Sequence, residues 1–396
     1  MREVVIASPV RTPVGKFGGA LRDVQVNELS VLVISEVIRR SGIDPAGIDG
    51  VVMGQSAANG ENPNIGRIGV LEAGLPVEIP SLTVERQCGS GLQAIITAGL
   101  EVLSCATDVM IAGGVESMSN IEYYVTGSRW GSKLGHQTFY DRWDRSVERV
   151  STERFGHVPN MIYTAENVAK LLNISREEQD EFAVLSHAKC IAAMDASKFK
   201  DEIVPVKVRG PKGKETIVDT DEHPRRDATL ENLAKLKPIL GGTVTAGNAS
   251  GMNDGAAACL ILSAEKAEEL GIKPLAYLRG HTVTGIDPTI MGLGPVEAVQ
   301  KLLKRSGLTL DQIDLIELNE AFAAQALGVL KQLGITDYSK VNVNGSGISL
   351  GHPIGCTGVR IMATLLHEMQ RRNAKYAIET LCCGGGMGIA ALIEKV

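Results

Sequence analysis

Two cysteines and one histidine of this 396-residue chain stand in sequence contexts suited to acyl-transfer chemistry. Cys88 lies in the stretch Gln-Cys-Gly-Ser-Gly-Leu, which we interpret as the glycine-punctuated start of a helix. Amides and the dipole at a helix start stabilise a thiolate and lower its pKa, so Cys88 is a candidate nucleophile. His352 lies in the rigid turn Gly-His-Pro-Ile-Gly, and a near-neutral pKa would suit it to take the thiol proton.

Cys88 and His352 occupy equivalent places in an internal repeat. Residues 41–49 and 306–314 share Ser, Gly, Ile and Asp at four positions, and Cys88 and His352 follow these segments at nearly the same spacing. A lone cysteine is more often a small buried side chain, and a lone histidine can simply cap a turn. The matched positions in a duplicated fold favour one shared active site instead.

Cys382 is a third candidate, since it follows an expected strand over 377–381 and precedes a glycine-rich loop. A thiol there can act as acid or base if its pKa is tuned, and free amides of the loop could form an oxyanion hole. We align Cys382 with Ile111 of the first copy, so this thiol has no counterpart in that copy. Cys382 would therefore break the symmetry of the pair.

Asn319 ends another expected strand, over 315–318, and aligns with Gly54 of the first copy. Its side-chain amide could position a water molecule or polarise a carbonyl. The alternative interpretation is a helix N-cap, with Phe322 in the core.

Composition bounds the class of protein. The length suggests two or three domains, and 44% hydrophobic and 22% charged residues are typical of a soluble globular protein. A net charge of −6 without a basic run argues against nucleic acid or an anionic membrane as the main partner. No apolar run or signal-peptide pattern predicts membrane insertion or export. Seven cysteines without framework or zinc-site spacing indicate free thiols, no metal and a reducing compartment, the cytoplasm.

Alternating strand and helix patterns predict an α/β fold of two similar halves around an insert, with mostly parallel sheets. The first half covers 1–118 and 249–272, with strands expected at 4–7, 50–53, 82–85 and 108–112 and helices at 27–40, 65–72 and 92–103. The second half covers 273–396, with strands at 276–280, 315–318, 340–343, 377–381 and 388–393 and helices at 295–306, 321–333 and 359–371. The insert, 119–248, is aromatic-rich between residues 123 and 163, and Ser175 with Glu178 predicts a helix with a capping box.

Together these stretches resemble the thiolases, the CoA-dependent acyltransferases that make or cleave 3-oxoacyl-CoA, and in particular the members acting on acetoacetyl-CoA. The resemblance covers the whole chain. It implies duplicated βαβαβαββ halves in a five-layer αβαβα core, with an inserted loop domain that holds CoA. It also implies acyl-CoA, acetyl-CoA and CoA as substrates, no further cofactor, and a homodimer or homotetramer.

The resemblance also implies roles for single residues in a ping-pong reaction. Cys88 would be the acylated nucleophile, His352 its activator, and Cys382 the acid/base that acts on the α-carbon of the second acetyl group. Asn319 would hold a water that forms one oxyanion hole with His352, and the amides of Cys88 and Gly384 would form the other. The expected contacts to CoA and the acyl chain are Arg225, Ser250, Met161, Ala246 and Phe322.

The chain departs from the family pattern at Asn160-Met161-Ile162, at Gly345-Ser346-Gly347 and at Gln87. These departures leave the acyl-chain length open, including a longer-chain 3-ketoacyl-CoA thiolase. One hypothesis is that an aromatic lid containing Trp130 reshapes the acyl pocket; the alternative is that these aromatics pack the insert or a subunit contact. Two rival functions stay open as well: a ketosynthase, in which the cysteine is paired with two histidines, and a non-catalytic CoA- or lipid-binding homologue.

Overall fold

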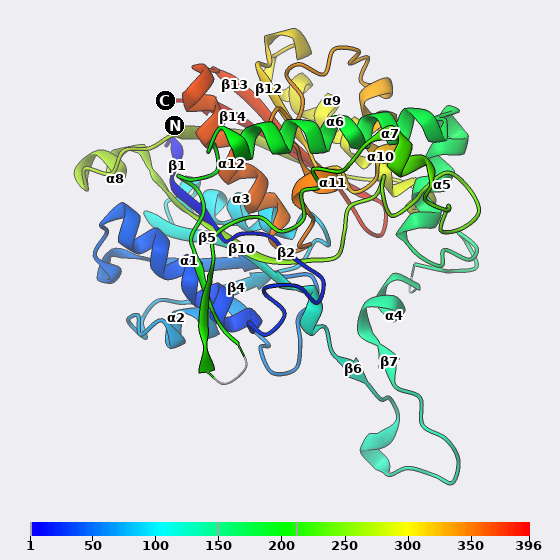
Figure 1. The fold of residues 1–396 in the computed structure, drawn as a ribbon. Coiled ribbons are helices and arrows are strands. Elements are labelled where there is room, and N and C mark those ends of the chain that lie inside the picture. Colours follow the sequence, from blue (N-terminus) through cyan, green and yellow to red (C-terminus); the bar gives the residue numbers. More distant parts are fainter. Residues whose placement is uncertain (1, 149, 211–212) are drawn as a thin grey trace.

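The computed structural model describes residues 2–148, 150–210 and 213–396; residue 1 of the predicted first half and residues 149, 211 and 212 of the predicted insert lie outside them. Ten strands in these ranges form one mixed sheet (Figure 1). The first half supplies β1 (Val4–Arg11), β2 (Gly15–Lys16), β3 (Gly50–Gly54), β4 (Ser81–Val84), β5 (Val109–Ser117) and β10 (Asn253–Ser263). The second half supplies β11 (Ala276–Gly285), β12 (Leu315–Leu318), β13 (Tyr376–Cys383) and β14 (Met387–Lys395).

The strand order is β4-β3-β5-β10-β1 in the first half and β12-β13-β14-β11 in the second, and antiparallel pairing of β1 with β11 joins the halves. The prediction of mostly parallel sheets is wrong. β3 is parallel to β4 and β5, and β12 to β13, but the remaining pairs are antiparallel. A tight glycine loop joins β13 directly to β14, and such a connection reverses the chain, whereas parallel pairing needs a crossover.

Two strand predictions also need correction. β10 was not predicted from the sequence, because this strand is buried on both faces and shows no alternation. The strand expected over 340–343 is reduced to isolated bridges, one of them from Val341 to Ile316. Asn342 adopts a left-handed conformation, with φ of 45°, and this interrupts the extended backbone.

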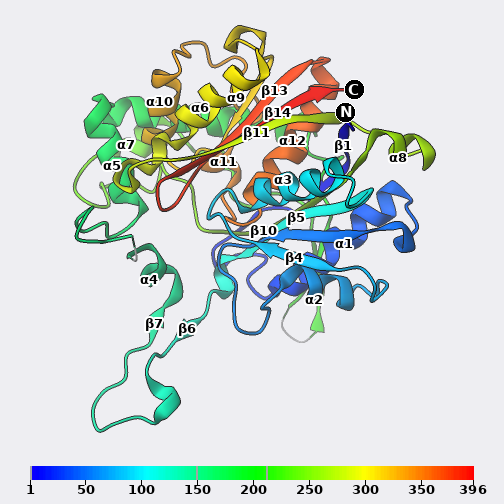
Figure 2. The same ribbon diagram turned by 180° about the vertical axis from the view of Figure 1, so that it is seen from behind.

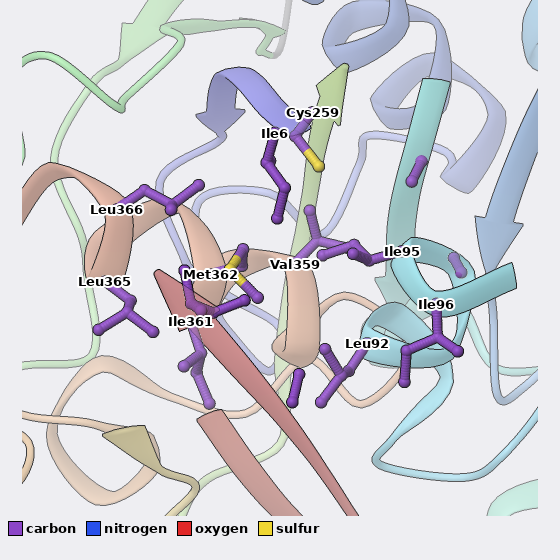
Figure 3. Packing of buried hydrophobic residues seen from close by; sticks show 14 of the residues in the cluster. Ile6, Leu92, Ile95, Ile96, Cys259, Val359, Ile361, Met362, Leu365 and Leu366 are labelled. Atoms are coloured by element: carbon purple, nitrogen blue, oxygen red, sulfur yellow. The ribbon is translucent and has the colours of Figure 1, made fainter. Parts of the chain in front are cut away.

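Helices and sheet halves form five layers, as the resemblance implied. The helices α1 (Val26–Ser41) and α2 (Ile65–Glu72) cover the outer face of the first half, and α9 (Gly294–Ser306) and α10 (Ala323–Gln332) cover that of the second. Between the two halves lie α3 (Ser90–Leu103) and α12 (Thr357–Arg372). Figure 3 shows this middle layer, where Leu92, Ile95 and Ile96 of α3 pack near Val359 and Met362 of α12.

The internal repeat is visible in the backbone. Gly42 and Gly307 end α1 and α9 in the same left-handed conformation, with φ of 69° in both. The Asp49 amide then donates to the Val109 carbonyl, and the Asp314 amide donates to the Tyr376 carbonyl. Counting along β5 and β13 from these bonds places Val115, not Ile111, opposite Cys382. The predicted counterpart was therefore wrong, because the sequence segments were aligned without the strand register.

The insert contains α5 (Met161–Leu172), α6 (Arg176–Asp195), α7 (Leu230–Ala234) and the hairpin β8 (Val206–Arg209) and β9 (Glu215–Val218). The predicted capping box of Ser175 and Glu178 is confirmed at the start of α6. An arm formed by β6 (Tyr123–Tyr124), β7 (Tyr140–Asp141) and α4 (Arg142–Glu148) extends away from the body (Figures 1 and 2). In the described part of the chain, no helix is both long and apolar enough to cross a membrane.

Trp130 lies in this arm and is 91% exposed, so it does not cover a pocket of its own chain. The hypothesis of an intrachain aromatic lid is therefore wrong for Trp130. The neighbouring Leu134 and Phe139 are also exposed, which favours the alternative of a subunit contact.

A charged cluster is buried in the middle layer. Glu317 and Glu379 are neighbours in the parallel register of β12 and β13, and the Arg360 guanidinium of α12 lies close enough to lower the pKa of both. Among the described residues, neither the Arg360 guanidinium nor the Glu379 carboxylate has a hydrogen-bond partner. Burial raises the pKa of Glu317 to about 8, and burial and Glu317 raise the pKa of Glu379 well above its ordinary value.

Replacing Glu379 should therefore stabilise the protein at alkaline pH. The unfolded chain releases the Glu379 proton near the ordinary pKa of 4.5, whereas the folded protein retains it, so the free energy of unfolding falls as pH rises. Glu379→Gln should gain about 1–3 kcal/mol at about pH 8 and little at about pH 5, measured by urea unfolding. The exposed Glu181→Gln is the control, and a gain that is independent of pH would contradict the explanation.

Candidate active site

A strained turn between β4 and α3 holds Cys88. Gln87 adopts a positive φ of 49°, which is unusual for a residue with a side chain. The Ser90 hydroxyl accepts a 2.8 Å hydrogen bond from the Arg86 amide and donates one of 2.7 Å to the Gln87 carbonyl. The Gln87 amide donates to Glu85 Oε1 at 2.6 Å. These bonds fix the backbone on both sides of the thiol.

Cys88 is half-buried, and the backbone amides of Gly384 and of Cys88 itself lie close enough to the thiol to lower its pKa. Gly384 follows β13, so the two halves of the protein supply one amide each. Burial raises the pKa of Cys88 to about 11 and outweighs the two amides, which lower it. The prediction of a lowered thiol pKa was therefore wrong, because a helix start that is removed from water no longer favours the charged form.

His352 is buried in the turn that leads to α12. Its amide donates to Asn253 Oδ1 at 2.9 Å, and its Nδ1 lies 2.6 Å from the Thr357 hydroxyl oxygen. Burial, assisted by the Arg360 charge, lowers the pKa of His352 to about 3. The imidazole is neutral at pH 7, as a base must be, although its pKa is lower than the near-neutral value expected from the sequence.

Asn319 lies beside the imidazole, with its Nδ2 3.4 Å from His352 Nε2. The N-cap of α10 is Phe322, so the alternative interpretation of Asn319 as a helix cap is wrong. The neighbouring Glu320 accepts hydrogen bonds from Ser186 Oγ at 2.6 Å and Asn342 Nδ2 at 2.7 Å. This network fixes the loop that presents Asn319, whose Oδ1 is buried without a partner among the described residues.

Cys382 lies in β13 and is fully buried. It belongs to an apolar cluster with Phe322, against which Met161 of α5 packs. Burial, with a smaller contribution from the neighbouring Cys88, raises its pKa well above the ordinary value. The structure thus brings both thiols and two of the expected acyl-chain contacts, Met161 and Phe322, to one place.

The expected CoA contacts on the insert are more dispersed. The Ser250 amide donates to the Ala321 carbonyl at 2.9 Å, which places Ser250 next to the Asn319 loop. Arg225 and Ala246 are exposed on the insert. The Arg225 amide donates to His187 Nδ1 at 3.2 Å, so its backbone is held while its guanidinium stays in solvent. In the part of the chain that the structure describes, no cluster of three or more His, Cys, Asp or Glu side chains is suited to a metal ion.

Glu116, a buried residue at the end of β5, was not identified from the sequence. Its carboxylate accepts hydrogen bonds from the amides of Ser56 at 2.9 Å, Ala57 at 3.2 Å and Gly355 at 2.9 Å. It therefore ties the loop after β3 to the turn that carries His352. Counted from Val109, Glu116 corresponds to Cys383 of the second copy, the neighbour of Cys382. A correct strand register would therefore have placed Glu116 near the site. Asn253 and Thr357, the partners of His352, were missed for lack of any local pattern.

Comparisons with known proteins agree with this geometry. The family model "Thiolase, N-terminal domain" matches residues 4–265, and "Thiolase, C-terminal domain" matches residues 272–395. An acetyl-CoA acetyltransferase of Chromobacterium violaceum is 47% identical over 99% of this chain and 100% of the relative. Beta-ketothiolase BktB of Cupriavidus necator is 47% identical over the full length of both chains.

Solved structures share the fold of the chain. The acetyl-CoA acetyltransferase of Bacillus anthracis has a TM-score of 0.96 and 45% identity, covering 100% of this chain and 99% of that one. Human mitochondrial 3-ketoacyl-CoA thiolase in complex with CoA has a TM-score of 0.94 and 41% identity, covering 100% and 98%. The chain belongs to the thiolase family, which confirms the resemblance found in the sequence.

Proposed function

We propose that this thiolase is an acetyl-CoA C-acyltransferase, which condenses acetyl-CoA with an acyl-CoA and cleaves 3-oxoacyl-CoA in the reverse direction. The observation that carries the proposal is that the two thiols and Gly384 are neighbours, while the turn that carries His352 packs on the start of the helix after Cys88. Relatives named acetyl-CoA acetyltransferase and a solved relative that holds CoA support the substrate class.

In the first half-reaction, the Cys88 proton moves to His352 and the thiolate attacks the thioester carbonyl. The amides of Cys88 and Gly384, which lie beside the thiol, would donate hydrogen bonds to the oxyanion that forms. When the carbon–sulfur bond breaks, CoA leaves as a thiol with the proton of Cys382, and the acyl group stays on Cys88. Cys382 is then a thiolate of high pKa, a strong base.

In the second half-reaction, Cys382 removes an α-proton from acetyl-CoA, which restores its thiol. The enolate oxygen is stabilised by a water held by Asn319 together with His352, and the α-carbon attacks the acyl group on Cys88. A carbon–carbon bond forms, the Cys88 thioester breaks, and Cys88 recovers its proton from His352. Protons therefore balance over the cycle, and the residues end as they began.

We propose acetyl-CoA and acetoacetyl-CoA as the preferred substrates, because several relatives of 45–47% identity carry the name acetyl-CoA acetyltransferase. A longer-chain 3-ketoacyl-CoA thiolase is the second candidate, favoured by the likeness to the human mitochondrial enzyme. Thiolysis rates across 3-oxoacyl-CoA chain lengths separate the two. A ketosynthase is disfavoured, because the third position holds Cys382 and not a second histidine.

We further propose that the chain works in the cytoplasm without a bound metal or redox cofactor. All seven cysteines are free thiols, which suits a reducing compartment. Cell fractionation tests the compartment. Dialysis against a chelator tests whether the enzyme needs a metal, and full activity is expected afterwards.

Cys88→Ser should abolish turnover and also the release of CoA from acetyl-CoA alone, because a serine hydroxyl is a far weaker nucleophile in this site. The loss should exceed about 10³-fold. A thiol-sensitive dye detects the released CoA, and single-turnover kinetics separate this release from complete turnover. The exposed Cys105→Ser is the control. CoA release that persists in Cys88→Ser would refute the assignment of the nucleophile.

Cys382→Ser should separate the two half-reactions. Acylation of Cys88 should continue, because His352 can give its proton to the departing CoA, whereas condensation should fall by about 10²-fold or more. Mass spectrometry of the acyl-enzyme and acetoacetyl-CoA formation measure the two steps. The buried Cys190→Ser is the matched control, and normal condensation by Cys382→Ser would place the base elsewhere.

We propose that the chain forms homodimers or homotetramers. The exposed apolar side chains of Trp130, Leu134 and Phe139 on the arm and of Leu82 on β4, the end strand of the described sheet, support this. The double variant Trp130→Glu with Leu134→Glu should reduce the mass measured by sedimentation velocity. Lys133→Gln on the same arm is the control, and an unchanged mass of the double variant would exclude the arm as a contact.

A further inference from the structure

The hydrogen bonds around His352 indicate which nitrogen of its neutral ring carries the proton. The Thr357 hydroxyl oxygen lies 2.6 Å from His352 Nδ1 and 2.9 Å from the Pro353 carbonyl oxygen. A hydroxyl group has a single proton, and a carbonyl oxygen can only accept. The Thr357 proton therefore points to Pro353, and the hydroxyl oxygen accepts the proton of His352 Nδ1.

This arrangement selects one of the two neutral forms of the ring. With the proton on Nδ1, the lone pair is on Nε2, which faces the Asn319 amide nitrogen at 3.4 Å. An amide nitrogen donates, so the Asn319 contact favours the same form from the other side of the ring. Both neighbours thus leave Nε2 as the acceptor that points into the site.

We propose that Thr357 is a positioning residue of the reaction, which holds the His352 imidazole in the Nδ1–H form and so leaves Nε2 as the unprotonated nitrogen that takes the Cys88 proton. This inference rests on the proposed function, since it assigns the base of that same site. In other enzymes a carboxylate holds the equivalent proton. A neutral hydroxyl can hold the Nδ1 proton in the same way whether or not Nε2 carries the Cys88 proton.

The hydroxyl group has no competing structural duty at the start of α12. The helix has no side-chain cap, and the Pro353 carbonyl also accepts hydrogen bonds from the amides of Cys356 and Thr357, both at 2.9 Å. Replacing threonine by valine therefore leaves the Pro353 carbonyl bonded and conserves the volume of the buried side chain. The imidazole Nδ1 is the group that loses its partner.

The test compares Thr357→Val with Thr357→Ser. Valine should lower kcat for acetoacetyl-CoA synthesis by about 10- to 100-fold at unchanged KM, because Thr357 does not touch the substrate. Serine should restore most of kcat. Thr364→Val is the matched control, since it removes another buried hydroxyl of α12, one that donates to Glu202 at 2.8 Å, and should keep normal kcat.

Long-range ¹H–¹⁵N NMR of histidine-labelled protein provides a reading independent of turnover, with His352 assigned from its loss in His352→Gln. The wild type should show a protonated Nδ1 and a bare Nε2, and Thr357→Val should lose this preference. A protonated Nε2 in the wild type, or normal kcat in Thr357→Val, would overturn the inference. Failure of the proposed function would look different: the wild type would form no product, whereas the NMR comparison would still report the tautomer.

Discussion

The close approach of α3 and α12 at their first turns is the constraint on which the rest of the structure depends. A side chain at Gly91 would place its Cβ 2.9 Å from the Val359 amide nitrogen, and one at Gly358 would overlap the Leu92 backbone. Only glycine permits the two helix starts to touch there. Since Cys88 precedes one helix and His352 precedes the other, this contact brings together the two turns that carry the thiol and the imidazole.

The same contact explains the electrostatics of the site. Packing the helix starts together buries the imidazole and part of the thiol, and both groups are then driven towards their neutral forms. A resting thiolate–imidazolium pair is not favoured here. The amides of Cys88 and Gly384 beside the thiol lower its pKa but do not offset its burial. Glu116 keeps this geometry in place, because its carboxylate bonds loops from both halves.

Motifs with local signatures could be predicted from the sequence: the helices expected in the two halves, the capping box at Ser175 and the repeat. The predictions that failed concern features that depend on partners distant in the chain. β10 lacks alternation because both of its faces are covered, and the counterpart of Cys382 required the register between β5 and β13. Thr357 could not be recognised, because its role depends on a ring and a carbonyl that only the folded turn brings to it.

The pairing of β1 with β11 has a mechanical consequence. Val5 and Ile6 form ladder pairs with Tyr277 and Ala276, so the sheet runs without a break from one half to the other. The two halves cannot separate by a hinge motion, because opening them would break both the strand pairing and the packing of the middle layer. Catalytic groups on such a rigid frame stay in register through both half-reactions. Exchange of one bulky thioester for the next therefore cannot rely on the two halves moving apart.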